Sequence, residues 1–212
     1  MRRHFVDRRL PQAKRKGDLT MLELRLLDDG DVPLVQTWLN KEHVKRWFEI
    51  PRLGVTIDDW MDEIKERKGA FHWLTHLMVL CQGRPIGLCQ YYRCEDSGED
   101  FGDLPQEGSY GIDYLIGEES HIGKGLGGEM IALLVDRIFS FPDAQRVTAD
   151  IDEDNKASER ALLSCGFTLR DAKRSRYVIE KTEFDKKGGK AAGNGALFAA
   201  QVPFRGQCKK DQ

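Results

Sequence analysis

The sequence predicts a single domain of the mixed α/β class, in which helices flank one sheet. Segments that alternate apolar and polar residues, as strands do, come first and pair as a hairpin. Further along the chain, such segments alternate with segments of helical period, which is the pattern of a mixed sheet. The length of 212 residues suits one domain with tails, and no internal repeat is visible.

The first half of the chain is predicted to hold two helices and a hairpin. Asp31 and Thr56 are residue types that cap helix N-termini, and Pro33 is tolerated in a first turn. A Gln-Gly-Arg turn separates the two strands of the hairpin. The expected elements are a strand over 22–26, a helix over 31–39, a helix from Thr56 or Asp58 to about Arg67, and strands over 74–81 and 85–92.

The second half is predicted to begin with a strand over 110–117, which leads into a glycine-rich turn. Apolar residues at helical spacing follow Gly128, and Pro142 ends that helix. The remaining elements are expected to be a strand over 147–151, a helix led by Asn155, and strands over 167–171 and 177–181.

The glycine turn indicates an anion site. Glycines let the backbone approach a ligand closely, and free N–H groups at a helix start attract phosphate. Gly123, Gly125 and Gly127 fit the dinucleotide template poorly. Lys124 precedes Gly125 where a Walker motif needs Ser or Thr. Alone, the turn is also compatible with a helix entry that binds nothing.

The order of strand, Gly-Lys-Gly-Leu-Gly turn, helix, strand and Asn155-led helix ending in Gly166-Phe167 resembles the GNAT superfamily of acetyl-CoA-dependent N-acyltransferases. The resemblance implies a mixed, mostly antiparallel sheet with splayed central strands. In that family the turn is written R/Q-x-x-G-x-G/A, and its amides hold the coenzyme A pyrophosphate. Here the pattern starts at Ile122, so the usual Arg or Gln is missing. Because backbone N–H groups bind the pyrophosphate, the missing side chain weakens the inferred binding little.

From about Leu22 to about Lys181 the chain looks like the aminoglycoside 6'-N-acetyltransferase branch. The matching pieces include Trp38-Leu39-Asn40, the Gly83–Gly87 turn, and Gly111-Ile112-Asp113. A related branch, which acylates siderophore precursors, usually carries His where this chain has Asp113. That position favours the aminoglycoside branch.

The resemblance assigns residues to acetyl-CoA, the expected co-substrate. Backbone groups of the splayed strand would hold and polarise the thioester, and the turn would hold the pyrophosphate. The residues expected to bind the coenzyme are Leu115, Ile116, Ile122, Gly123, Lys124, Gly125, Leu126, Gly127, Asn155 and Ser158. No metal is expected.

Asp113 is the expected catalytic residue, which holds the acceptor amine and takes its proton. An unperturbed Asp has a pKa near ~3.9, so positioning is expected to be its larger contribution. Asp150 matches a second acidic position of the aminoglycoside branch and is expected to bind another ammonium group. Many GNAT enzymes protonate the leaving thiolate with a Tyr, but that position is Leu162 here, which puts the leaving-group acid in doubt.

Residues 94–108 contain six carboxylates and no Lys or Arg. This acidic segment is interpreted as a lid that attracts a polycation, with a solvated loop as the alternative. Trp47, Phe48 and Tyr92 are expected to supply apolar walls for a sugar, although core packing explains any single one of them.

The composition excludes several classes of protein. A formal charge of −2 gives no global attraction to nucleic acid, and no apolar run approaches a membrane span. Five cysteines without C-x-x-C spacing predict reduced thiols in the cytoplasm over a disulfide framework or a zinc site. A monomer or a homodimer is expected.

The ends differ from the middle. Residues 1–20 form a basic arm without the apolar run of a signal peptide and are expected to be disordered. Residues 21–184 are expected to be the acetyltransferase domain, and residues 185–212 a flexible tail.

Three functions remain open from the sequence. The first is an acetyl-CoA-dependent aminoglycoside 6'-N-acetyltransferase, and the second an N-acyltransferase for a polyamine, a siderophore precursor or a protein amine. The third is a catalytically weak acyl-CoA-binding module, which the Leu162 departure allows. Asp113 and Asp150 weigh against the third, because a mere binder needs neither carboxylate.

Overall fold

The structure is a computed structural model that describes residues 22–186. Those residues form one seven-stranded sheet in the order β1-β2-β3-β4-β5-β7-β6. The strands are β1 Leu22–Leu26, β2 Thr75–Cys81, β3 Arg84–Arg93, β4 Ser109–Ile116, β5 Arg146–Asp150, β6 Thr168–Asp171 and β7 Arg176–Glu180. The helices are α1 Val32–Leu39, α2 Glu42–Phe48, α3 Ile57–Lys65, α4 Cys94–Ser97, α5 Leu126–Phe139, α6 Lys156–Ser164 and α7 Lys181–Lys186, with short 3-10 turns at Asp29–Asp31, Pro51–Leu53 and Glu119–His121.

Neighbouring strands pair antiparallel except β4 and β5, which run parallel. The mixed, mostly antiparallel sheet expected from the sequence is therefore confirmed. A parallel pair needs a long crossover connection, and α5 supplies it between β4 and β5. The glycine turn that is expected to bind the coenzyme lies in this crossover, at the start of α5.

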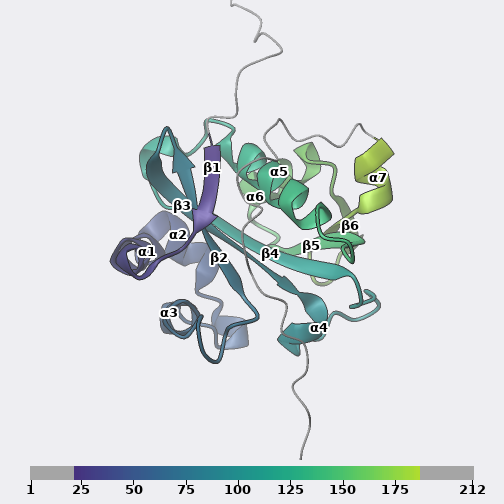
Figure 1. The fold of residues 1–212 in the computed structure, drawn as a ribbon, viewed down its shortest axis with the longest axis horizontal. Helices are drawn as coiled ribbons and strands as arrows, with labels where there is room; N and C mark the ends of the chain where they lie inside the picture. The colour runs from purple at the N-terminus through teal and green to yellow at the C-terminus, as the bar shows by residue number, and fades with distance from the viewer. Residues whose placement is uncertain (1–21, 187–212) are drawn as a thin grey trace, which may run out of the picture.

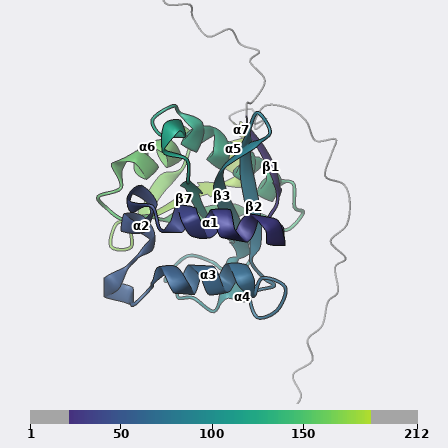
Figure 2. The same ribbon diagram turned by 90° about the vertical axis from the view of Figure 1, so that its left-hand side faces the viewer.

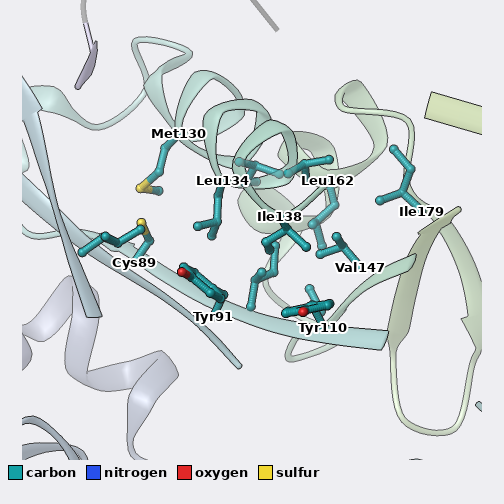
Figure 3. Packing of buried hydrophobic residues seen from close by; sticks show 14 of the residues in the cluster. Cys89, Tyr91, Tyr110, Met130, Leu134, Ile138, Val147, Leu162 and Ile179 are labelled. Carbon is teal, nitrogen blue, oxygen red and sulfur yellow. The ribbon is translucent and has the colours of Figure 1, made fainter. Parts of the chain in front are cut away.

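Each face of the sheet carries its own apolar core (Figures 1 and 2). On one face, α5 and α6 bury Met130, Leu134, Ile138 and Leu162 against the sheet. Figure 3 shows Met130, Leu134 and Ile138 of α5 directed toward the strands, which carry Cys89, Tyr91 and Tyr110. The opposite face packs against α1, α2 and α3 through a second cluster built around Trp38, Met61, Ile64, Leu88 and Leu115.

The hairpin and the second helix form as the local sequence predicts. Gln82 and Gly83 both take positive φ values, 52° and 73°, which suits the tight turn between β2 and β3. Thr56 caps α3 in a capping box with Asp59. Met61 and Ile64 of that helix are buried, as their spacing predicts.

Two expectations were wrong in detail. Asp31 does not cap α1 with its side chain; its carboxylate accepts two hydrogen bonds from Arg25 at 2.6 and 2.7 Å, while Asp28 caps the preceding 3-10 turn. No helix was expected after residue 39 and before Thr56, yet Glu42–Phe48 forms α2, which carries Trp47 and Phe48. After β7 the chain is helical over Lys181–Lys186, and the boundary between domain and tail expected at residue 185 stays a prediction.

The structure describes neither the basic arm nor the C-terminal tail beyond residue 186, so both calls lie outside the described residues. Within residues 22–186, no helix combines the length and apolarity needed to cross a bilayer. No group of three or more His, Cys, Asp or Glu side chains in that range is placed to hold a metal ion. Cys81, Cys89, Cys94 and Cys165 are free thiols, and Cys208 lies outside the range.

The end of β4 is fixed by a close approach to α1. A Cβ on Gly117 would lie 2.1 Å from Cγ of Trp38, which is fully buried. The Trp38 indole N–H donates to Glu118 at 2.7 Å, and the Lys41 ammonium donates to the Gly117 carbonyl at 2.9 Å. Gly117 is therefore required by packing.

We predict that Gly117→Ala destabilises the fold by about 1–3 kcal/mol, because the new methyl group must displace a packed indole. Thermal unfolding of the two proteins measures this. Gly127→Ala is the matched control, because the nearest atom to its new Cβ is 3.8 Å away and Ala favours a helix over Gly. Equal melting temperatures for Gly117→Ala and the unmodified protein would contradict the packing account.

Candidate active site

The sheet opens between β4 and β5. β4 pairs with β3 from Tyr110 to Ile116, but it pairs with β5 only from Ser109 to Gly111. Beyond Gly111, the β5-facing edge of β4 has no strand partner among the described residues. This is the splay that the family resemblance implies.

The hydrogen-bond phase of β4 shows which backbone groups face the gap. The Gly117 N–H donates to the Ile86 carbonyl at 2.8 Å, and N–H directions alternate along an antiparallel strand. The amides of Asp113 and Leu115 therefore point at β3, and those of Tyr114 and Ile116 point into the gap. Backbone N–H groups near Tyr114 to Ile116 were expected to polarise the thioester, and the strand geometry turns the Tyr114 and Ile116 amides toward the gap and the Leu115 amide toward β3.

The glycine turn forms the start of α5. Gly123 and Gly125 have φ values of 75° and 80°, which an L side chain rarely adopts. A Cβ on either would meet nothing within 4 Å, so the space above the turn is open. Gly125 is the N-cap residue and offers no side chain, which leaves the first amides of α5 to an external anion. This turn fits a coenzyme pyrophosphate.

The other predicted turn residues divide by exposure. Ile122 and Lys124 are exposed, whereas the Leu126 side chain is buried at 3% in the α5 core. Gly127 lies on the face of α5 that meets α6, where a Cβ would be 3.8 Å from Ala161. Leu126 and Gly127 can therefore offer a ligand their backbone amides only.

Asn155 and Ser158 already make structural contacts. The Asn155 side-chain carbonyl accepts the Ser158 N–H at 3.1 Å and caps α6. The Ser158 hydroxyl hydrogen-bonds the Tyr114 hydroxyl, which links α6 to the unpaired stretch of β4. Both residues lie beside the gap, and their role toward the coenzyme stays a prediction. Leu162 is fully buried in the α5–α6 core and presents no group to the gap.

Asp113 lies on the opposite face of β4, toward α3. Part of its surface reaches solvent, yet protein atoms crowd the carboxyl closely enough that lost hydration raises its pKa to about 7. The Gln90 amide donates to it at 3.0 Å, and Gln90 is its cross-strand neighbour. The expectation of an ordinary Asp pKa was wrong: Asp113 titrates where a general base is most effective.

Further carboxyl groups surround Asp113. The charges of Glu99 and Asp150 help to raise its pKa. Glu63 of α3 lies near it as well, and burial together with the Asp113 charge raises the pKa of Glu63 to about 7. Burial and the Asp150 charge also raise the pKa of Glu99. The site thus concentrates negative potential on the α3 side of β4.

Asp150 differs from these groups because it has a cationic partner. Arg176, its cross-strand neighbour on β7, donates to both of its oxygens at 2.7 Å. The Arg176 guanidinium is also bonded to the Phe101 carbonyl, so it holds the acidic segment against the sheet. Asp150 keeps 47% of its side chain exposed and stays a predicted acceptor contact.

The aromatic residues contribute unequally. Phe48 packs edge-to-face on Trp60, with ring centres 4.9 Å apart, and both line a hollow that reaches Asp113. Tyr92 packs against Trp73, and its hydroxyl lies 3.5 Å from Glu99. Trp47 instead stacks under the Arg46 guanidinium at 4.4 Å. Phe48 and Tyr92 therefore border the acidic site directly, and Trp47 does not line the hollow.

Arginine side chains from outside the acidic segment neutralise some of its carboxylates. Arg93 pairs with Glu95, and Arg174 pairs with Asp100 at 3.1 Å. Cys94 and Phe101 are buried and anchor the segment. Glu99 is the residue of this segment whose charge acts on Asp113, and within residues 22–186 it forms no ion pair with a Lys or Arg, so a cation at the site would meet its carboxylate.

Residues 28–173 match the family described as Acetyltransferase (GNAT) domain. The chain belongs to this GNAT acetyltransferase family. It is 28% identical over 145 residues to an aminoglycoside N(6')-acetyltransferase type 1 of Klebsiella pneumoniae, a match that covers 68% of this chain and 72% of that protein. The same figures hold for the protein of that name from Serratia marcescens.

Solved structures show the same likeness. Crystal structures of the aminoglycoside acetyltransferase AAC(6')-Ib with coenzyme A, and with coenzyme A and kanamycin, match with a TM-score of 0.66 and 25% identity. Each match covers 79% of this chain and 99% of the other. This GNAT protein is thus an N-acetyltransferase that uses acetyl-CoA as its co-substrate, as the sequence resemblance implied.

Two residues that shape the electrostatics of the candidate site escaped the sequence analysis. The helix that carries Glu63 was predicted from the spacing of its apolar residues, and Glu63 lies among its polar ones. Nothing in the local sequence distinguishes Glu63 from Asp62 or Glu66. Arg176 reaches Asp150 only through the pairing of β5 with β7. Arg176 lies directly before the strand predicted over 177–181, so the sequence assigned it no role in that strand.

We predict that Gly125→Val abolishes measurable coenzyme A binding. A β-branched side chain would fill the open space above the turn and strain the positive φ. Isothermal calorimetry with coenzyme A provides the measurement. Gly54→Val is the matched control, since Gly54 has φ 71° and equally open surroundings but lies between α2 and α3. Unchanged affinity in the folded Gly125→Val protein would rule out the turn as the pyrophosphate site.

We predict that the acidic segment acts through Glu99. Glu99→Gln should raise the KM for a cationic acceptor several-fold at low salt, because its charge lies beside Asp113 without an ion pair. Glu95→Gln should have little effect, because Arg93 already neutralises Glu95. Steady-state kinetics at two ionic strengths compare the variants, and equal effects of both would refute the assignment to Glu99.

Proposed function

We propose that this enzyme transfers the acetyl group of acetyl-CoA to a primary amine of an aminoglycoside, at the 6' position, and so confers resistance to such antibiotics. The similar proteins from two bacteria carry that activity in their names. The observation that carries the proposal is Asp113: a carboxyl with a pKa near 7, beside an open strand edge, without a cationic partner among the described residues.

The acceptor is proposed to enter on the α3 face of β4. An aminoglycoside carries several ammonium groups, and the Asp113, Glu63, Glu99 and Asp150 carboxyls offer complementary charge. Phe48 and Tyr92 provide apolar surface beside that charge, which suits a sugar ring. Charge and apolar walls together favour an amino sugar over an uncharged acceptor.

The proposed chemistry begins with a proton transfer at Asp113. An ammonium group cannot attack a carbonyl carbon, so the Asp113 carboxylate takes one proton and leaves a neutral amine held at its oxygen. The Gln90 amide fixes the carboxyl orientation. Acetyl-CoA supplies the acetyl group: the neutral amine would form a bond to the acetyl carbon, and the C–S bond would break. Coenzyme A would leave as a thiolate that takes a proton from water, because Leu162 offers no acid. The α5 turn and the gap-facing amides are proposed to hold the acetyl-CoA.

The Tyr114 and Ile116 amides are proposed to stabilise negative charge on a carbonyl oxygen in the gap. Backbone donors that are already in place act without reorganisation, and each such donor is typically worth about 2.7–4 kcal/mol of barrier. The Asp113 carboxyl lies on the same strand, one residue from Tyr114. The base and the oxyanion donors are therefore held by one rigid element.

The cytoplasm is the proposed location, because free thiols are the state that a reducing compartment maintains. Polyamines and lysine side chains remain the competing acceptors from the sequence. They carry ammonium groups but no sugar ring, so a panel that contains all three classes separates the proposals.

We predict that Asp113→Asn lowers kcat by about 10²–10⁴-fold while coenzyme A binding is unchanged. The amide keeps the shape but accepts no proton. In the unmodified enzyme, kcat/KM should fall as the pH drops below about 7, because protonation of Asp113 removes the base, and it should level off above that pH. A pH profile measured on a panel of aminoglycosides, polyamines and lysine derivatives tests both points.

Asp62→Asn is the matched control for this substitution. Asp62 is an exposed carboxylate on α3, so its loss changes the net charge equally without touching the site. Full activity of Asp113→Asn at neutral pH would remove Asp113 from the mechanism. Acetylation of lysine derivatives alone would overturn the aminoglycoside proposal.

A further inference from the structure

The gap between β4 and β5 is bordered by a phenol hydroxyl that the proton transfer at Asp113 does not use. Tyr114 packs against the core on the α5–α6 side of the sheet, because side chains of successive strand residues point to opposite faces. Its hydroxyl hydrogen-bonds the Ser158 hydroxyl at the start of α6. Since the Tyr114 amide faces the gap as well, this one residue offers two hydrogen-bond donors there.

Helix α6 connects this hydroxyl with the glycine turn. Ala161 of α6 lies 3.8 Å from the position of a Cβ on Gly127, at the start of α5. Ser158 lies one helical turn before Ala161, and so toward the start of α6. A coenzyme with its pyrophosphate at the turn and its thioester at β4 spans the stretch that these residues border. The Tyr114 hydroxyl lies at the thioester end of that stretch.

The same face of α6 lacks a phenol of its own. Ser158 and Leu162 are four residues apart and therefore share one face of the helix. Helix side chains lean toward the N-terminus, so a side chain at position 162 leans toward Ser158. Leu162 offers no polar group in that direction. Tyr114 brings a hydroxyl to this place from the strand instead.

The Tyr114 hydroxyl is suited to donate a hydrogen bond and to keep its proton. Part of the side chain reaches solvent, yet protein atoms around the phenol exclude enough water to raise its pKa. The Ser158 hydrogen bond acts in the opposite direction, and the nearby titratable groups Cys165 and Asp113 raise the pKa further. The phenol therefore stays protonated near neutral pH and remains a donor.

We propose that Tyr114 is a further catalytic residue, whose hydroxyl donates a hydrogen bond to the sulfur of the departing coenzyme A. Ser158 is its positioning residue: a Ser158 hydroxyl that donates to the Tyr114 oxygen directs the Tyr114 hydrogen toward the sulfur. This inference rests on the proposed place of the thioester in the gap.

The proposed step moves one electron pair onto sulfur. As the amine nitrogen bonds to the acetyl carbon, the C–S bond breaks and its electron pair stays on the sulfur. The Tyr114 hydroxyl stabilises the thiolate without losing its own proton. The thiolate then takes a proton from water, and the nitrogen releases one to water as the amide forms, so the protons balance.

Tyr114→Phe removes the hydroxyl and keeps the ring. We expect it to lower kcat about 10–100-fold with KM for acetyl-CoA nearly unchanged, which is the usual loss for one hydrogen bond to a charged group. Ser158→Ala should lower kcat less. Tyr110→Phe is the matched control, because Tyr110 lies on the same face of β4, in its paired stretch, and its hydroxyl donates to Asp143. It should leave kcat unchanged.

Acetyl-seleno-coenzyme A separates a role at the leaving group from a structural role. A selenolate is a weaker base than a thiolate, so it needs less stabilisation as it leaves. The loss of kcat in Tyr114→Phe should therefore be smaller with the selenoester than with acetyl-CoA. A structural role would lower both rates by the same factor.

The thiol pKa of bound coenzyme A is a readout that needs no acceptor. A free thiol has a pKa near ~8.5, and a hydrogen bond to the thiolate lowers it. Ultraviolet absorbance of the thiolate, with desulfo-coenzyme A as the blank, measures this pKa in each complex. We expect the pKa to be higher in the complex with Tyr114→Phe than in the complexes with Tyr110→Phe and the unmodified protein.

An unchanged thiol pKa in the Tyr114→Phe complex would overturn the inference, and so would equal losses of kcat with the two acetyl donors. Either result leaves the acetyltransferase proposal standing. Failure of the unmodified enzyme to acetylate any amine of the panel would instead count against the proposed function, and the thiol pKa would still decide the role of Tyr114.

Discussion

The functional architecture depends on the departure of β5 from β4 after Gly111. A sheet normally pairs every interior backbone group, and an unpaired amide in the interior is costly. Beyond Gly111 the β5-facing amides of β4 have no strand partner, so the Tyr114 and Ile116 amides face a gap. The rest of the arrangement holds that gap in place: β3 pairs with β4 along its other edge, and α6 is tied to Tyr114 through Ser158.

The two faces of β4 separate two tasks. The face toward α5 carries the glycine turn and the open helix start, which suit a phosphate-bearing coenzyme. The face toward α3 carries Asp113, Glu63 and Gln90, which suit a cation. A single strand therefore lies between the proposed anion site and the proposed cation site. Like-charged carboxyls held close together cost stability, which is typical of residues retained for function.

The parts of the fold that local sequence determines were predictable. The hairpin needed only the Gln82-Gly83 turn, and α3 needed only the Thr56 cap and its apolar spacing. The glycine turn before α5 was also predictable, because its glycines are local in the sequence. In contrast, α2 was missed because Lys41 precedes it without a side-chain cap, so the helix carries no start signal.

The electrostatics of the site were not predictable, because they arise between strands and helices far apart in the chain. Asp150 looked like a free ligand for an ammonium group until β7 placed Arg176 opposite it. Nothing in the sequence predicts a raised pKa for Asp113, because the burial that raises it comes from the packing of distant segments. Asp31 was assigned to a helix cap, whereas the β1 residue Arg25 binds it.

Amide hydrogen exchange measured by NMR, with and without saturating acetyl-CoA, tests the central claim most directly. The account predicts that in the free protein the Tyr114 and Ile116 amides exchange fast, while those of Asp113 and Leu115, paired to β3, exchange slowly. Acetyl-CoA should slow Tyr114 and Ile116 and leave the paired amides as they were. Slow exchange of Tyr114 and Ile116 before ligand is added, or fast exchange at saturation, would contradict the claim that the open edge of β4 holds the acyl group.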